Sequence, residues 1–477
     1  MERIFKLYII IGIFSILGIA SCSDDDNFSS SPQYVLAFSS DTLRLDTVFS
    51  NVPTITRSFW AYNRSGEGIR CSKVVLENGN QTGFRVNVDG TYLGPTAGFQ
   101  ATDVEIRKGD SIRVFVELTS GTQNTQAPNK IEDNLIFSLE SGVQQKVNLN
   151  ACSWDAMMLR NTIIPAGKDS LLQSEKPIVV YGDIVVDSMA TLRIGAGTSL
   201  YFHENAGLKV YGTLKVEGKS GTGVVLRGDR LDRMFGYLPY DRTPGRWHGI
   251  HIMASSYGNV IQNADIHSAY TGIMIDSSDV SREKLLLRNT TVHNSQGDGI
   301  YLDYAKVRME NCQLTNALGH CLYACGGDVE VNQCTIAQFY PFDAMRRSAI
   351  GMMAPMTRFD VKNSLVTGYS ADEVMWTPID GKEMNFLFDH CVLRTEKMQT
   401  EDSLKFANVV YEDLSDTVKF GKKHFLSIDE DNFSYDFRLS GNSAAIGIAE
   451  PSTALPLDKN GIRRKEDAPD AGCYQHE

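Results

Sequence analysis

The sequence predicts an all-β protein with an N-terminal antiparallel β-sandwich followed by a right-handed parallel β-helix, a solenoid. Three observations support this fold class. Short strands with period-two alternation fill the first third of the chain, still shorter glycine-punctuated strands follow, and a repeat of about 22–30 residues then continues towards the C-terminus. A chain of 477 residues is also too long for one ordinary core, so more than one domain is expected.

The first 21 residues are typical of an export signal. Arg3 and Lys6 precede an apolar run over residues 7–20, which is shorter than the roughly 20 residues of a membrane-spanning helix. The run ends in Ile-Ala-Ser-Cys, which resembles the lipobox of bacterial lipoproteins. This resemblance implies cleavage before Cys22 and lipidation of that cysteine. The alternative is an ordinary signal peptide whose cysteine is incidental.

Residues 22–33 form an acidic and polar tether. Asp24, Asp25 and Asp26 follow the cysteine directly and resemble the export signal of Bacteroidetes lipoproteins sent to the outer face of the outer membrane. The resemblance implies a lipid-anchored protein of the outer membrane that faces the cell exterior. A merely solvated linker would have a similar composition.

Residues 34–151 are expected to form an immunoglobulin-like β-sandwich. Alternating segments at residues 42–49, 84–88 and 111–118 are separated by turn residues at regular spacing. Residues 46–49, residues 84–90 and Trp154-Asp155-Ala156 resemble the N-terminal sandwich of a group of Bacteroidetes surface lipoproteins. That resemblance implies no activity.

Residues 152–402 are expected to form the β-helix. A four-residue motif recurs six times: it begins with a polar residue, continues with a small residue and then any residue, and ends with a branched residue. The branched residues of the six copies are Ile266, Val292, Leu314, Ile336, Val366 and Leu393. Strands this short cannot bury an apolar face alone, so the coils must stack and pair through their backbones. The polar residue, usually Asn, suits a left-handed turn, and its amide is expected to bond to its copy one coil away.

Three further features follow from this repeat. One long step predicts a loop insertion around residues 340–347. Cys312 and Cys334 are expected to stack inside neighbouring coils, as free thiols in preference to a disulfide. Residues 403–477 are expected to be the last coils and a C-terminal cap, because an open solenoid end exposes unpaired strand edges. Residues 443–447 and 458–463 resemble the terminal segment of secreted bacterial β-helix proteins.

Outward positions of the repeat gather a strip of polar and aromatic residues. Taking Ile250, Ile273, Ile300, Leu322 and Ile350 as inward, the candidate catalytic residues are Asp276, Asp298, Asp303, His248 and His251. Paired carboxylates of this kind serve glycosidases. The candidate ligand-binding residues are Tyr301, Tyr323 and Trp247, since aromatic rings stack on sugars. Polar residues on an outward strip also arise by chance in any solenoid.

A second candidate surface is the insertion at residues 229–246. It combines arginines with aromatic residues, a composition typical of interface anchors, and the alternative is a long solvated loop. Residues 297–300, Gly-Asp-Gly-Ile, resemble a step in polygalacturonases, but the other catalytic patterns of those enzymes are missing from the sequence.

The sequence therefore predicts a non-catalytic scaffold that presents a binding face to outer-membrane partner proteins or to glycans. The alternative is a polysaccharide lyase or glycoside hydrolase that uses the outward carboxylates. A net charge of −12 argues against nucleic acid as a partner. The cysteine spacings match no standard metal pattern, so neither a metal nor a cofactor is expected.

Overall fold

The computed structural model describes residues 27–477, which form two compact units. The first ends at Ser153, and the second comprises residues 124–127 and 154–477. The predicted signal peptide, Cys22 and the three aspartates of the tether lie outside the described residues. Within the described part of the chain, no helix combines the length and the apolar character needed to cross a membrane.

The first unit is an antiparallel sandwich of two five-stranded sheets around one core. Alternation places every second residue of β8 inside, and Phe59 and Phe137 meet between the sheets with ring centroids 6.4 Å apart. One sheet has the order β1 (Leu36–Phe38), β3 (Arg57–Asn63), β8 (Ser111–Leu118), β5 (Phe84–Val88), β6 (Thr91–Tyr92). The other has the order β2 (Thr42–Phe49), β10 (Gln144–Trp154), β9 (Asn129–Leu139), β4 (Ile69–Leu76), β7 (Gln100–Ile106). The predicted strands at residues 42–49, 84–88 and 111–118 are β2, β5 and β8.

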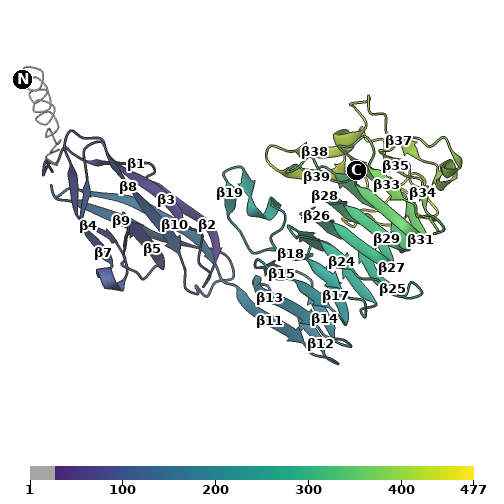
Figure 1. Cartoon of the computed structure of the whole chain (residues 1–477), viewed down its shortest axis with the longest axis horizontal. Helices are drawn as coiled ribbons and strands as arrows, with labels where there is room; N and C mark the ends of the chain where they lie inside the picture. Colours follow the sequence, from purple (N-terminus) through teal and green to yellow (C-terminus); the bar gives the residue numbers. More distant parts are fainter. Residues whose placement is uncertain (1–26) are drawn as a thin grey trace, which may run out of the picture. The chain divides into compact units, whose positions relative to one another are not determined.

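The second unit is a parallel β-helix whose strands stack in three columns (Figure 1). Two strands, β11 (Met157–Ile164) and β13 (Ile178–Val186), begin the first two columns. The first column continues as β15 (Ser199–Phe202), β18 (Val224–Gly228), β23 (Ala264–His267), β26 (Thr291–Ser295), β28 (Gln313–Ala317), β30 (Thr335–Gln338), β32 (Leu365–Gly368), β35 (Val392–Leu393), β37 (Val410–Tyr411). We call its outer side the covered face.

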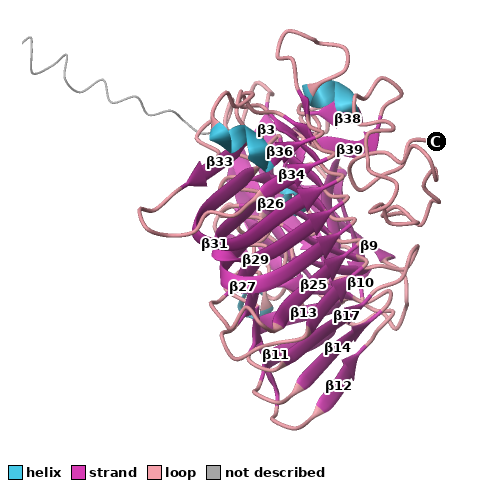
Figure 2. Ribbon diagram, turned by 90° about the vertical axis from the view of Figure 1, so that its right-hand side faces the viewer, coloured by secondary structure: helices cyan, strands magenta, loops and turns pink. Residues whose placement is uncertain are grey.

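The second column contributes what we call the open face. It continues as β16 (Leu208–Val210), β21 (Ile250–Ile252), β24 (Ile273–Ile275), β27 (Ile300–Glu310), β29 (Leu322–Asn332), β31 (Ile350–Lys362), β33 (Val374–Thr377). The third column contains β12 (Asp169–Leu172), β14 (Thr191–Gly195), β17 (Thr213–Glu217), β22 (Asn259–Gln262), β25 (Glu283–Arg288), β34 (Leu387–Asp389), β36 (Phe406–Ala407). The long strands β27, β29 and β31 run from the open face into this third column and lie side by side (Figure 2).

The predicted inward column is confirmed. Ile250 pairs with Ile273, Ile273 with Ile300, Ile300 with Leu322, and Leu322 with Ile350. All five side chains are buried in one continuous core. The stack arises because each coil offers its backbone groups to the next coil and leaves a row of identical apolar positions inside.

The predicted left-handed turns are also confirmed. Asn263, Asn289, Asn311, Gln333 and Asn363 all have φ between 46° and 51°. Their amides do not form the expected ladder from copy to copy. Instead, the side chains of Asn311, Gln333 and Asn363 bond to the C-terminal part of the chain. The backbone ladder already connects the coils at this column, which leaves the amides available for a covering segment.

That covering segment is residues 440–477, which we call the C-terminal strap. It follows the antiparallel pair β38 (Phe425–Asp429) and β39 (Ser434–Leu439). A cap over the open end was expected, but the contacts of the strap run along the side of the coils. Its apolar residues pack with Phe339 and with outward side chains of the covered face, such as Ala337 and Leu365. The physical reason is that the apolar side chains of this part of the face would otherwise meet water.

The long repeat step and the stacked cysteines occur as predicted. The chain has no strand between the end of β30 and the start of β31, where the insertion around residues 340–347 lies. Cys312 and Cys334 are buried and free, and the backbone N–H of Cys312 donates to Cys334 Sγ at 3.3 Å. These thiols therefore fill the core as small apolar side chains.

Candidate functional site

The open face brings the predicted outward strip together. Strand register places His251 beside Met274, Met274 beside Tyr301, and Tyr301 beside Tyr323. Ile275 pairs with Leu302, so the residues that follow them, Asp276 and Asp303, lie on adjacent coils. The columns deduced from the repeat are therefore real columns in the fold.

Part of this strip is hollowed into a groove of about 360 Å³. Of the predicted site residues, the groove includes His248, His251, Asp298 and Tyr301. The full lining is Gly207, Leu208, Lys209, His248, Gly249, Ile250, His251, Tyr270, Thr271, Met274, Asp298, Tyr301. The predicted residues Asp276, Asp303 and Tyr323 lie outside the lining.

Two acidic groups of the strip, Asp276 and Asp298, have different environments. His251 Nε2 donates to Asp276 Oδ1 at 2.7 Å, so this carboxylate is already engaged. Asp298 Oδ1 accepts the backbone N–H of His320 at 2.7 Å. Burial raises the pKa of Asp298. Asp298 is therefore the carboxyl group of the groove that is most suited to holding a proton.

Aromatic side chains give the strip its apolar character. The rings of Tyr301 and Tyr323 lie 5.9 Å apart, and Tyr323 stacks on His320 at 4.8 Å. Burial raises the pKa of both tyrosines to about 12, so both stay neutral phenols at pH 7. Tyr270 is the most accessible aromatic residue of the groove, with 57% of its surface exposed.

The prediction that Trp247 binds a ligand is wrong. Its side chain is 1% exposed and stacks on Phe202 at 4.3 Å inside the β-helix. Its Nε1–H donates to the carbonyl of His267 at 2.8 Å. An indole with one satisfied donor and a large apolar surface is more stable in the core than at the surface, so Trp247 anchors the corner that follows the insertion.

The insertion at residues 229–246 holds β19 (Arg233–Phe235) and β20 (Leu238–Pro239). One of its arginines, which were expected to contact a partner, instead bonds within the insertion. Arg230 binds Asp232 through two hydrogen bonds of 2.7 and 2.6 Å. Phe235 and Tyr237 are exposed and stack on each other at 5.7 Å. Tyr237 also stacks on Phe433 at 6.3 Å, so part of this aromatic surface already contacts the turn between β38 and β39. The contact surface for a partner stays a prediction.

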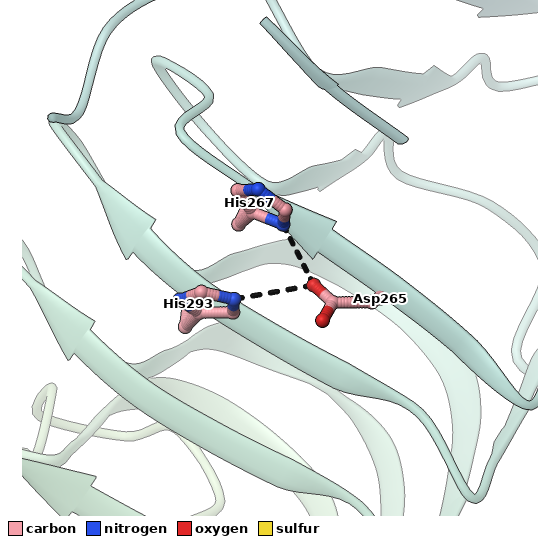
Figure 3. Close-up of side chains that lie close together, drawn as sticks. All are labelled: Asp265, His267 and His293. Atoms are coloured by element: carbon pink, nitrogen blue, oxygen red, sulfur yellow. Dashed lines mark hydrogen bonds and ion pairs between the residues drawn. The ribbon is translucent and has the colours of Figure 1, made fainter. Parts of the chain in front are cut away.

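A second polar cluster lies on the covered face (Figure 3). Asp265 and His267 are two residues apart on β23, and strand register places His293 of β26 beside His267. His267 Nδ1 and His293 Nε2 lie 2.7 and 3.1 Å from Asp265 Oδ1. The ligand atoms of all three residues are within 4.8 Å of one another, a spacing that could hold a metal ion.

Burial and mutual contact set the charges of this cluster. Burial lowers the pKa of His267 to about 4, so its imidazole is neutral at pH 7. Burial opposes the ionisation of Asp265, but the two imidazoles hold the pKa of its carboxyl well below the usual range. Neither this cluster nor a metal was expected from the sequence. The signal was available, because both histidines follow the branched residue of the repeat, Ile266 in one copy and Val292 in the next.

The comparisons with known proteins address the fold. The family model described as a right handed beta helix region matches residues 246–355. This match and the parallel columns define the second unit as a right-handed parallel β-helix. No curated protein matches the sequence.

Among solved structures, a family 123 glycoside hydrolase from Clostridium perfringens, described for glycolipid glycan hydrolysis, is similar at 9% identity with a TM-score of 0.18. That similarity covers 27% of this chain and 30% of the hydrolase. The chain therefore spans less than a third of the length of that structure, and a similarity this low supports no functional argument.

Proposed function

We propose that this chain is a lipid-anchored protein of the bacterial outer surface whose β-helix binds a glycan in the open-face groove without cleaving it. The observation that carries the proposal is the mixed lining of the groove. Tyr270, Tyr301 and Met274 offer apolar surface, while His248 and Asp298 offer hydrogen-bonding groups. Ligand sites typically combine a mainly apolar surface with a few polar groups, and aromatic rings stack on the apolar faces of sugar rings.

The carboxylates favour binding over cleavage. A glycosidase needs two carboxyl groups about 5–10 Å apart on either side of the scissile bond. Within the described residues, the groove lining contains one carboxylate, Asp298. The nearby Asp276 is engaged by His251, which reduces its availability as a base or nucleophile.

One observation favours the alternative of a glycoside hydrolase or polysaccharide lyase. Burial raises the pKa of Asp298, and general acids of glycosidases have carboxyl groups with a raised pKa. The enzyme alternative therefore assigns the proton-donating role to Asp298, and its test is the release of oligosaccharide.

The location rests on the N-terminal sequence. The basic residues, the short apolar run and the lipobox-like ending at Cys22 support lipidation, and the three following aspartates support export to the cell surface. Mass spectrometry of the native protein is expected to show acyl chains on residue 22. A Cys22→Ser variant is expected to lose membrane association, and intact cells are expected to expose the wild-type chain to added protease.

The binding proposal is tested by affinity electrophoresis of the purified chain through gels that contain a panel of plant and host polysaccharides. Tyr301→Ala is expected to weaken the retarded interaction by about tenfold, or ~1.4 kcal/mol. Tyr211→Ala is the matched control, because Tyr211 is an exposed tyrosine outside the groove lining.

Three outcomes would contradict the proposal. Equal weakening by both variants would show that the groove is not the binding surface. Release of oligosaccharide that stops in Asp298→Asn would establish the enzyme alternative. Retardation by no polysaccharide, together with co-purification of an outer-membrane protein after mild detergent extraction, would assign the open face to a protein partner.

A further inference from the structure

We propose that Asp265, His267 and His293 form a binding site for a divalent transition-metal ion, with Zn²⁺ as the reference ion. The two imidazole nitrogens both point at Asp265 Oδ1 on the covered face (Figure 3), and the three ligand atoms lie within 4.8 Å of one another. Nitrogen and oxygen donors of this kind bind zinc, and three protein ligands leave a fourth position for water or another ligand.

The distances suit a cation after a small adjustment. Bonds of about 2.0–2.1 Å place the ligand atoms of a tetrahedral zinc site roughly 3.3 Å apart. The two measured separations from Asp265 Oδ1, 2.7 and 3.1 Å, are slightly shorter, as hydrogen bonds are. To bind a metal ion, each neutral imidazole would carry its single N–H proton on the other ring nitrogen, so that His267 Nδ1 and His293 Nε2 present lone pairs to the ion.

The ligands are held by regular strands. Asp265 and His267 share one side of β23 because strand residues alternate, and the parallel register sets His293 beside His267. The two rings stack with centroids 4.7 Å apart. Rigid elements position ligands more accurately than loops do, so the cluster is largely preorganised for a metal.

The surroundings shield the site without closing it. Two residues next to the ligands bond to the insertion. Ser268 Oγ donates to the carbonyl of Asp241, and Asn294 Nδ2 donates to the carbonyl of Arg242. These contacts help to bury both histidines, which are 7% and 9% exposed, while the Asp265 side chain keeps 46% of its surface exposed. Asp265 is therefore the most accessible residue of the cluster.

One neighbouring charge opposes the metal. Leu226 of β18 pairs with Ile266, so the next residue, Arg227, lies one coil before His267. Its guanidinium turns towards the insertion, donating to the carbonyl of Arg230 at 2.6 Å and lying 3.6 Å from Asp241. The nearby Asp241 carboxylate partly balances this charge, so it weakens the site without removing it.

The test is equilibrium dialysis of the full chain, without a histidine tag, against Zn²⁺ and separately against Co²⁺. One bound equivalent per chain is expected, at least about tenfold weaker in His293→Gln and in Asp265→Asn. His203→Gln is the matched control, because His203 also pairs with an aspartate, Asp229, at 2.6 Å, but on another coil and, among the described residues, without a second histidine at that carboxylate. The cobalt spectrum is expected to show nitrogen and oxygen ligation without thiolate charge-transfer bands.

The outcomes distinguish this site from metal binding elsewhere on the chain. Zinc binding that persists in both variants, or a cobalt spectrum with thiolate bands, would place the ion at a different site and overturn the proposal, as would the absence of binding. Asp265→Asn preserves the shape of the side chain, so thermal unfolding without metal is expected to match wild type and to exclude misfolding. The inference is independent of the groove, because failure of glycan binding would leave the zinc stoichiometry unchanged.

Discussion

The open and covered faces of the β-helix are built by the same coils, yet their outward side chains differ in exposure to solvent. Both come from short parallel strands with strict inward and outward alternation. On the open face, outward residues such as Tyr270 and Met274 remain exposed around a groove. On the covered face, outward residues such as Ala337 and Leu365 are buried, because residues of the C-terminal strap pack against them.

This difference shows that the repeat determines the strand register of the coils but not which outward side chains are exposed to solvent. Polar groups on the covered face must find protein partners, as Gln313 does by accepting the hydroxyl of Tyr474 at 2.8 Å. Polar groups on the open face retain access to water or to a ligand. Mutations should therefore affect stability mainly on the covered face and in the core, and binding mainly on the open face.

The largest expected effect is at the corner between the two faces. Trp247→Ala removes a buried indole that stacks on Phe202 and is expected to destabilise the β-helix by about 3–5 kcal/mol. Urea unfolding measures this loss, and Trp247→Phe is expected to recover a large part of it. If Trp247→Ala kept its stability and lost only glycan binding, the sequence-based prediction that Trp247 binds a ligand would be correct.

The next effect tests the attachment of the strap. Arg464 is buried and donates to Asn311 Oδ1 at 2.9 Å and to the carbonyl of Gly472 at 3.0 Å. Arg464→Ala leaves these acceptors without their donor and is expected to cost about 2–3 kcal/mol. Hydrogen exchange is expected to rise in residues 440–477 and in β30, with the open face unchanged. Uniform exchange throughout the chain would show that the two faces are not energetically distinct.

A smaller effect depends on pH and belongs to the open face. Burial lowers the pKa of His320 to about 4, and its Nδ1–H donates to the carbonyl of Ser348 at 3.0 Å. The unfolded chain takes up this proton near pH 6.5 and the folded chain only near pH 4, so stability is lost as pH falls between these values. His320→Gln is expected to reduce the loss between pH 7 and pH 5 by about 1–2 kcal/mol in urea unfolding. An unchanged pH dependence would contradict this.

The smallest effect on stability is expected for Tyr270→Ala. More than half of the Tyr270 surface is exposed, so its removal should change the free energy of unfolding by less than about 0.5 kcal/mol. The same variant is expected to weaken glycan retardation in affinity electrophoresis. A stability loss as large as that of Arg464→Ala would show that the open face is structural and would remove the contrast between the faces.

The sequence predicted much of the fold and part of the site. The repeat identified the inward column from Ile250 to Ile350, the left-handed turn positions and the loop between β30 and β31. It succeeded because alternation and stacking are local rules that each coil obeys separately. It also assigned His248, His251, Asp298 and Tyr301 to one strip, which became the groove.

The remaining features depend on contacts between distant segments. The sequence around Trp247 predicts an accessible aromatic residue beside an insertion, and only its packing against Phe202 shows that it is buried. The Asp265 cluster required His267 and His293 to be aligned across two coils and then shielded. At Asn311 and Gln333 the expected amide ladder is replaced by hydrogen bonds to the strap, which lies more than a hundred residues away in the sequence.

The sequence by itself determined the all-β composition, the period of the coils and which side chains point inward, since these follow from residue pattern and strand geometry. Only the tertiary structure decided which outward face is covered, where the groove lies and which polar residues share a site. The physical reason is that apolar surface is buried by whichever segment can reach it, and that choice depends on the path of the whole chain.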